Sequence, residues 1–304
     1  MAILAFDVGG SSIKFSVMTA DGEILTKGSV DTPDNLDDFY NELIQVKESL
    51  AVKYKLIGAA FSLPGAVDDA AGIIGGTSAL PYIHDFPIKR ALGEKLFLPV
   101  AMENDANCAA LGEAWLGVAK LCQDVVFLVI GTGVGGAVVK NKQIHHGMHL
   151  HGGEFGYMVM DDKGTTLSNA ASTIALAEKV SLAKGLDKNA LNGKDVFALQ
   201  ETGDEIAHKA VEEMYEALAI AIYNIQYCVD PELFVIGGAI SERPDFAENI
   251  NRYIHSILAK VKIARICPQV VRAEHGNDAN LMGAVYNFLQ KINNFKLKGL
   301  FLGV

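Results

Sequence analysis

Asp7-Val8-Gly9-Gly10-Ser11-Ser12-Ile13-Lys14 is the stretch that decides the fold, because it places two adjacent glycines between runs of strand-forming residues at 2–6 and 14–18. Glycine lets the backbone turn tightly there and brings N–H groups against an anion, which a side chain at Cβ would prevent. The stretch therefore predicts a phosphate-binding turn between two strands, with an acidic residue at its entrance.

A second stretch, Ile130-Gly131-Thr132-Gly133-Val134-Gly135-Gly136, repeats this arrangement between predicted strands at 124–130 and 137–139. Between the two stretches, Glu103-Asn104-Asp105 follows a predicted strand at 98–102. One glycine loop is weak evidence, but two loops with these acidic residues point to phosphoryl transfer from a nucleotide held between two similar halves.

The order of the predicted elements also repeats. Each half opens with a β-meander around its glycine loop and continues with a helix and a further strand, which predicts an α/β fold with two similar halves. The expected helices are 36–54, 107–116, 205–229 before Pro231, and 281–291, and strands are expected at 56–61 and 233–236.

Composition limits the function classes. The chain has 304 residues, half of them hydrophobic, and a formal net charge of −10, which argues against nucleic-acid and anionic-membrane partners. No apolar run approaches the roughly 18 residues of a membrane span, and Asp7 comes too early for a signal peptide, so we expect a cytoplasmic protein. The four scattered cysteines predict reduced thiols.

The motifs, in their order and spacing, resemble those of the ROK family of sugar kinases and repressors, a member of the actin-like, hexokinase-like ATPase superfamily with its ribonuclease H-like fold. The resemblance covers nearly the whole chain and implies two domains: a small sugar-binding domain of residues 1–115 with a C-terminal helix at about 290–304, and a large nucleotide-binding domain of residues 116–289. Besides the two glycine stretches, its motifs are Leu63-Pro64-Gly65, Glu103-Asn104-Asp105-Ala106-Asn107, Gly153-Glu154-Phe155-Gly156-Tyr157-Met158 and Val235-Ile236-Gly237-Gly238.

By this resemblance Asp105 is the catalytic base. A sugar hydroxyl is a poor nucleophile, and a carboxylate that orients it and accepts its proton contributes roughly 10²–10⁴ in rate. Asn104 offers both a donor and an acceptor to a sugar hydroxyl. From the tripeptide alone, Asn104-Asp105 is equally well a turn and helix N-cap ahead of Ala106.

The resemblance assigns further residues to sugar, ATP and Mg²⁺. Asp7 would hold Mg²⁺ through water, with a capping aspartate as the alternative. The expected sugar contacts are Gly65, Asn104, Asp105, Glu154, Tyr157 and His151. The expected nucleotide contacts are Asp7, Gly9, Gly10, Ser11, Lys14, Gly131, Thr132, Gly133, Gly237 and Gly238, the glycines and Thr132 mostly through N–H groups. Close packing explains Gly237 and Gly238 nearly as well, and Glu154 could simply be solvated.

The chain also departs from the family pattern. Tyr157 stands in place of a histidine, and the cysteine-rich zinc segment is absent, so no structural zinc is expected. Ser168 aligns with a sugar-binding glutamate, and Ala79 with an asparagine. The smaller residues at these two positions leave space, which predicts a roomier pocket. The loss of two polar anchors also weakens discrimination among sugars. The cluster His145, His146, His149 and His151 adds a sugar contact from His151 or His149, with the other two exposed.

The sequence thus predicts an ATP-dependent kinase acting on the 6-hydroxyl of a hexose or β-glucoside, with a β-glucoside such as cellobiose favoured. The alternatives are a glucokinase, an N-acetylmannosamine kinase and, in a different class, a sugar-binding regulatory protein without turnover. A repressor would need a helix-turn-helix ahead of the glycine loop at residue 7. The family resemblance also implies a homodimer.

Overall fold

The computed structural model describes the backbone of residues 2–302 and the side chains of residues 2–292. The chain divides into two compact units. Unit 1 comprises Met1–Lys120, His146–His151 and Asn277–Val304, and unit 2 comprises Leu121–His145 and Gly152–Gly276. The side chains of the apolar tail from Phe295 onward lie outside the described residues. No helix within the described residues is both long and apolar enough to cross a membrane.

The sheet of unit 1 begins with the predicted meander. Its strands are β1 (Ala2–Val8), β2 (Ser12–Met18), β3 (Ile24–Asp31), β4 (Leu56–Leu63) and β7 (Val100–Asn104). They lie in the order β3-β2-β1-β4-β7, in which β1 to β3 pair antiparallel and β4 and β7 add in parallel. A hairpin of β5 (Ala66–Asp68) and β6 (Ile73–Gly75) follows β4.

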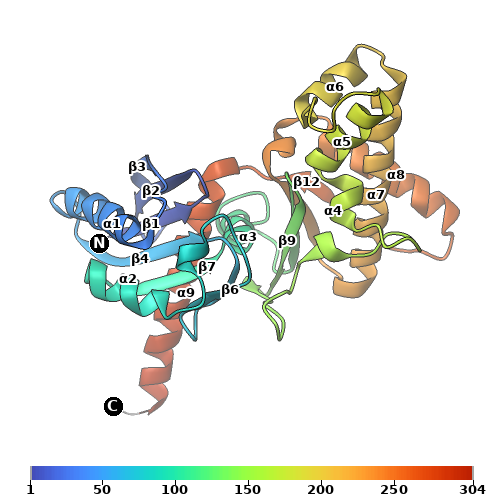
Figure 1. The fold of residues 1–304 in the computed structure, drawn as a ribbon. Helices are drawn as coiled ribbons and strands as arrows, with labels where there is room; N and C mark the ends of the chain where they lie inside the picture. The colour runs from blue at the N-terminus through green and yellow to red at the C-terminus, as the bar shows by residue number, and fades with distance from the viewer. Residues whose placement is uncertain (1, 303–304) are drawn as a thin grey trace. The chain divides into compact units, whose positions relative to one another are not determined.

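Helices cover both faces of this sheet because β1 is apolar at every second position on each side. Leu4 and Phe6 pack in one core with residues of α1 (Leu36–Ala51) and α2 (Ile88–Leu96). Ile3 and Ala5 point to the other face and pack with residues of α3 (Asp105–Trp115) and α9 (Ala279–Leu302). Figure 1 shows α3 and α9 in this part of the molecule.

Two glycines bring α3 and α9 into close contact. A Cβ on Gly112 would overlap the backbone of Ala279, and one on Gly283 would overlap the carbonyl oxygen of Cys108. The chain returns to unit 1 at Asn277, just ahead of α9, which runs as one continuous helix from Ala279. The first segment of unit 1 ends at Lys120.

Unit 2 repeats the strand order of unit 1. Its strands are β8 (Val125–Ile130), β9 (Val134–Lys140), β10 (Gln143–Ile144), β11 (Leu233–Gly237) and β12 (Val270–Arg272). They lie in the order β10-β9-β8-β11-β12, with an antiparallel meander followed by two parallel strands. The predicted duplication of a meander followed by βαβ is therefore confirmed.

The helices of unit 2 pack with Val126, Leu128 and Ile130 of β8 in one core. They are α4 (Leu167–Ala171), α5 (Thr173–Ala183), α6 (Gly193–Glu201), α7 (Glu205–Val229) and α8 (Phe246–Lys260). The bounds of α7 agree with the sequence prediction: Asp204 caps its start by accepting from Ala207 N, and Asp230 turns left-handed before Pro231. Figure 1 shows α4, α5, α6 and α8 near α7.

Candidate active site

Asp105 stands where β7 ends and α3 begins. Its Oδ1 accepts hydrogen bonds from Asn104 Nδ2 at 2.8 Å and from the backbone N of Ala106 at 2.8 Å. Asn104 is the N-cap of α3, since its Oδ1 accepts from Asn107 N at 3.2 Å. The capping interpretation is thus correct for Asn104, and the cap itself fixes the orientation of the neighbouring carboxylate.

The carboxyl group of Asp105 is electrostatically perturbed. The side chain is exposed at the surface of unit 1, and the protein atoms packed around it partly desolvate the carboxyl group. This burial raises the pKa of Asp105 above its usual value, and the negative charge of Asp7 raises it further. Hydrogen bonds from Ala106 and Asn104 act in the opposite direction without cancelling the shift. Such a carboxylate is a better proton acceptor than an ordinary aspartate.

Gly65 belongs to the same arrangement. Its carbonyl oxygen accepts from Asn104 Nδ2 at 3.1 Å, so one amide group contacts both Gly65 and Asp105. The φ of Gly65 is +98°, and a Cβ there would lie 2.9 Å from His84 Cε1, so glycine is required for this turn. The structure therefore brings together three of the residues predicted to contact sugar.

Asp7 lies near the end of β1, paired with Lys14 of β2 and Ser62 of β4. Ser62 Oγ donates to Asp7 Oδ1 at 2.7 Å. Burial raises the pKa of the Asp7 carboxyl, although the hydrogen bond from Ser62 and the charge of Lys14 lower it. A carboxylate oxygen is a ligand type that Mg²⁺ accepts, directly or through water. The described residues contain no ready-made cluster of three or more metal-ligating side chains.

Asn280 connects Asp7 to Asp105. Its Nδ2 donates to Ser62 Oγ at 3.3 Å and to the backbone oxygen of Asp105 at 3.1 Å. Sequence reasoning missed both Ser62 and Asn280. The only signal was that Gly276-Asn277-Asp278 precedes a predicted helix, which does not indicate where the helix packs.

The first glycine turn is exposed at Gly9, Gly10 and Ser11. Gly9 N donates to Ser12 O at 3.0 Å, so this N–H closes the turn and is not left for a phosphate. Within residues 2–302, no hydrogen bond occupies the N–H groups of Gly10 and Ser11. Lys14 Nζ, on β2 after the turn, donates to Asn277 Oδ1 at 3.0 Å.

The second glycine turn has the same closure. Gly131 N donates to Gly133 O at 2.9 Å, which corrects the expectation that Gly131 offers its N–H to a ligand. Thr173 holds the turn by donating its N and Oγ1 to Gly131 O at 2.9 and 2.8 Å. Thr132 is exposed, and in the described chain its N–H and that of Gly133 have no hydrogen-bond partner.

Two glycines of this region have no packing reason to be glycine. A Cβ on Gly131 or Gly135 would meet no atom within 4 Å, and neither residue has a positive φ. By contrast, a Cβ on Gly136 would lie 2.7 Å from Phe127 O. The open backbone at Gly131 and Gly135 is what a phosphate chain requires for close approach, so this turn fits a nucleotide.

Packing alone accounts for Gly237 and Gly238. A Cβ on Gly237 would overlap the ring of Phe127, and Gly238 has a φ of +86° with its Cβ position against Ile130 O. Neither glycine thus provides independent evidence for the predicted nucleotide contact.

Glu154 and Tyr157 project from a segment that glycines pack onto β9. Gly153 has a φ of +97° and lies against Ala137, and Gly156 lies against Val134 O. Glu154 is exposed, and 73% of Tyr157 is accessible. Both side chains are therefore available to a ligand of unit 2.

Ser168, which aligns with a sugar-binding glutamate of the family, makes local hydrogen bonds. Its Oγ accepts from Val134 N at 3.0 Å and contacts Val134 O at 3.3 Å, so the hydroxyl stabilises the start of β9.

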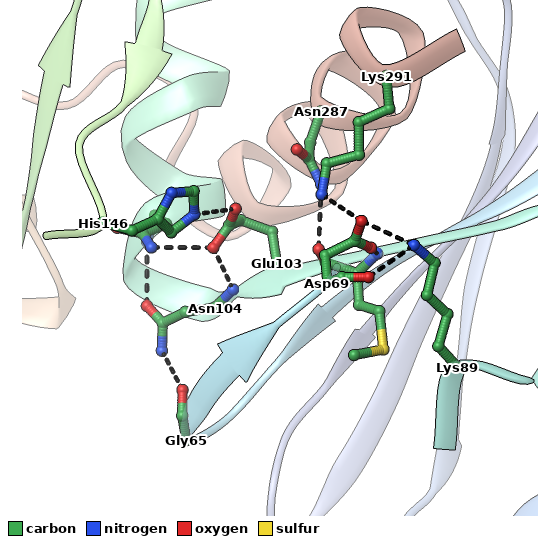
Figure 2. Close-up of polar contacts among 10 residues, drawn as sticks. Gly65, Asp69, Lys89, Glu103, Asn104, His146, Asn287 and Lys291 are labelled. Carbon is green, nitrogen blue, oxygen red and sulfur yellow. Dashed lines mark hydrogen bonds and ion pairs between the residues drawn. The ribbon is translucent and has the colours of Figure 1, made fainter. Parts of the chain in front are cut away.

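The histidine segment follows unit 2's β10, yet residues His146–His151 belong to unit 1. His146 was expected to be exposed, but its Nε2 lies 2.8 Å from Oε2 of the buried Glu103 (Figure 2). His151 Nδ1 contacts the carbonyl oxygen of His149 at 2.6 Å, and His145 is exposed. Sequence reasoning did not identify Glu103 as a partner, because 43 residues separate it from His146.

Two units with the same strand order, each with a glycine turn between its first two strands, define the actin-like ATPase fold. The model of the ROK family matches residues 3–291, and the chain belongs to this family.

Individual relatives match along almost their whole length. The beta-glucoside kinase of Listeria monocytogenes serovar 1/2a (strain EGD-e) is 33% identical over 299 residues, covering 96% of this chain and 99% of that protein. The glucokinase of Halalkalibacterium halodurans is 30% identical over 325 residues, covering 95% and 96%. The crystal structure of a ROK family protein from Streptococcus pneumoniae TIGR4 in complex with sucrose is 36% identical with a TM-score of 0.88, covering 97% of this chain and 100% of that one.

Proposed function

We propose that this protein is an ATP-dependent sugar kinase in which Asp105 accepts the proton of the attacking sugar hydroxyl. The observation that carries the proposal is the solvent-accessible Asp105 carboxylate, held by Asn104 and Ala106 at the start of α3. Membership of the ROK family and the kinase activities named for two relatives support the same reaction class.

The arrangement of Asp105 suits a general base. Both hydrogen bonds from Asn104 and Ala106 fall on Oδ1, and we assign proton acceptance to Oδ2. Its raised pKa increases the driving force for proton transfer from the sugar hydroxyl. Removal of its proton makes the sugar hydroxyl a stronger nucleophile as phosphoryl transfer begins. The hydrogen bonds to Oδ1 keep the Asp105 carboxylate from rotating away.

Sugar-binding roles are proposed for residues of each unit by itself. In unit 1 these are Gly65, Asn104 and His151, where the Asn104 oxygen retains one lone pair beyond its capping bond. In unit 2, the Glu154 carboxylate can accept two hydroxyl protons, and Tyr157 offers an apolar ring face with a hydroxyl at its end.

Phosphate-binding roles are proposed for each glycine turn by itself. The N–H groups of Thr132 and Gly133 in unit 2, and of Gly10 and Ser11 in unit 1, would face phosphate oxygens, with Lys14 supplying positive charge. Asp7 would hold Mg²⁺ through water, and the ion supplies neutralisation of phosphate charge. Ser62 and Asn280 keep the Asp7 carboxylate oriented for this task.

The acceptor we favour is a β-glucoside such as cellobiose, phosphorylated on its 6-hydroxyl. Two features support it: a beta-glucoside kinase is similar over nearly the full chain, and the serine at position 168 leaves the sugar without the anchor of a longer acidic side chain. Glucose is the second candidate, since a glucokinase is also 30% identical. N-acetylmannosamine is the third, because a solved structure described as a putative N-acetylmannosamine kinase from Listeria monocytogenes is 33% identical with a TM-score of 0.84.

The test is an ADP-release screen with Mg-ATP across glucose, mannose, N-acetylmannosamine, N-acetylglucosamine, cellobiose and gentiobiose. The same screen is run with Asp105→Asn, and sugar binding by both proteins is measured by calorimetry. We expect one strong β-glucoside acceptor and a loss of roughly 10²–10⁴ in kcat in the variant, with binding kept. Sugar binding without turnover in the wild type would overturn the kinase proposal in favour of a regulatory sugar-binding protein. Turnover of glucose equal to that of the β-glucosides would refute the β-glucoside assignment and leave the kinase proposal standing.

A further inference from the structure

Glu103 is a buried carboxylate beside the proposed base, and the proposed reaction gives it no direct part. Its side chain is 2% exposed, at the end of β7. Oε1 accepts from Asn104 N at 2.9 Å and from Asn107 Nδ2 at 2.9 Å, while Oε2 lies 2.8 Å from His146 Nε2. A buried carboxylate is tolerated only when such donors satisfy it.

The contacts of Glu103 lead directly to the proposed base. Its Oε1 fixes the peptide N–H of Asn104 at the point where β7 becomes α3. The side chain of Asn104 then donates to Asp105 Oδ1 and to Gly65 O. Figure 2 shows His146, Glu103, Asn104 and Gly65 joined in this order. Glu103 thus holds the backbone of the residue whose side-chain amide donates to Asp105.

His146 is the member of this chain of contacts that can change its charge near neutral pH. Its side chain is 38% exposed and comes from the His146–His151 segment. The hydrogen bond and charge of Glu103 raise the pKa of His146, against burial and the positive charge of Lys291 on α9, and Asp68 of β5 raises it slightly. The imidazolium therefore persists to a higher pH than in an ordinary histidine.

We propose that His146 is a positioning residue for phosphoryl transfer. As an imidazolium it pairs with Glu103, and the paired carboxylate holds Asn104 and thereby the orientation of Asp105. The same pair ties the His146–His151 segment to unit 1. The role rests on the proposed function, because it concerns the geometry of the proposed base.

The first test compares His146→Gln with His145→Gln, since His145 is the exposed neighbour and serves as a matched control. We expect kcat of His146→Gln to fall roughly ten- to a hundredfold, because a small misplacement of a catalytic group has that effect. The control should keep wild-type kcat. The wild type should lose kcat as pH rises through the raised His146 pKa, and His146→Gln should lack this alkaline decline. Wild-type kcat and an unchanged pH profile in His146→Gln would refute the role.

The second test reads the pair without turnover. Histidine ring protons are titrated by NMR in the wild type, in His146→Gln to assign the resonance, and in Glu103→Gln. We expect the pKa of His146 to fall in Glu103→Gln, whose fold is checked by circular dichroism. A His146 that already titrates at the ordinary value of about 6.5 in the wild type would refute the pairing. A wild type that phosphorylates no sugar would refute the proposed function and this role together, whereas an active wild type with a fully active His146→Gln would refute the role alone.

Discussion

Replacing Gly131 with alanine separates a glycine kept for a ligand from a glycine kept for folding. A Cβ at this position meets no protein atom within 4 Å, and the backbone is not in the left-handed region. The folded state should therefore accept the methyl group. Because alanine has fewer unfolded conformations than glycine, Gly131→Ala should leave stability unchanged or raise it by about 0.4–1 kcal/mol.

The same methyl group should weaken nucleotide binding. It would fill the open backbone of the turn and hold phosphate oxygens away from the N–H groups of Thr132 and Gly133. A hydrogen bond to a charged group contributes about 1.5–3 kcal/mol, and about 1.4 kcal/mol corresponds to tenfold in affinity. Losing one such bond should raise the Kd for Mg-ATP roughly ten- to a hundredfold.

The assay combines thermal unfolding with calorimetric titration of Mg-ATP. Gly93→Ala on α2 is the matched control, because its Cβ would make an ordinary contact 3.6 Å from Leu98 O. Both variants should melt no lower than the wild type, and only Gly131→Ala should bind Mg-ATP more weakly. An unchanged Kd in Gly131→Ala would refute the assignment of this turn to phosphate. A large drop in its melting temperature would contradict the open space around a Cβ at this position.

Four further predictions concern Asp105, the contact between α3 and α9, and Mg²⁺. Because burial raises the pKa of Asp105, acidification should begin to lower kcat/KM at a pH above the ordinary aspartate value of about 3.9. A decline in kcat/KM only at or below that value would contradict the raised pKa. The raised pKa also means that ionised Asp105 is disfavoured by folding, so stability is gained as pH falls through its folded-state pKa, and Asp105→Asn should melt no lower than the wild type at pH 7. Gly283→Ala forces a methyl group onto Cys108 O where α3 meets α9, which should cost about 1–3 kcal/mol of unfolding free energy in urea melts, and an unaffected variant would contradict the packing. Excess EDTA should stop ADP release and added Mg²⁺ should restore it, while turnover that persists in EDTA would exclude a Mg²⁺ role for Asp7.

Local chemistry made much of the fold predictable. The glycine turns, the apolar run of β1 and the apolar spacing of α7 are short-range patterns that a strand or helix imposes on its own residues. The duplicated order of elements could therefore be predicted before any contact was known. The N-cap at Asn104 was also identifiable, because a side chain that can cap a helix stands at the strand-to-helix junction, and Asp105 beside it stays the predicted base.

The sequence by itself thus determined the elements, their repeated order and the residue types at the ends of the strands. Only the tertiary structure decided the partners: Glu103 with His146, Asn280 with the backbone of Asp105, and Ser168 with Val134. It also decided that Gly9 and Gly131 close their own turns and that packing explains Gly237. The reason is physical, since periodicity reports which face of an element is buried, whereas polar partners as far as 263 residues apart are chosen by how the elements pack.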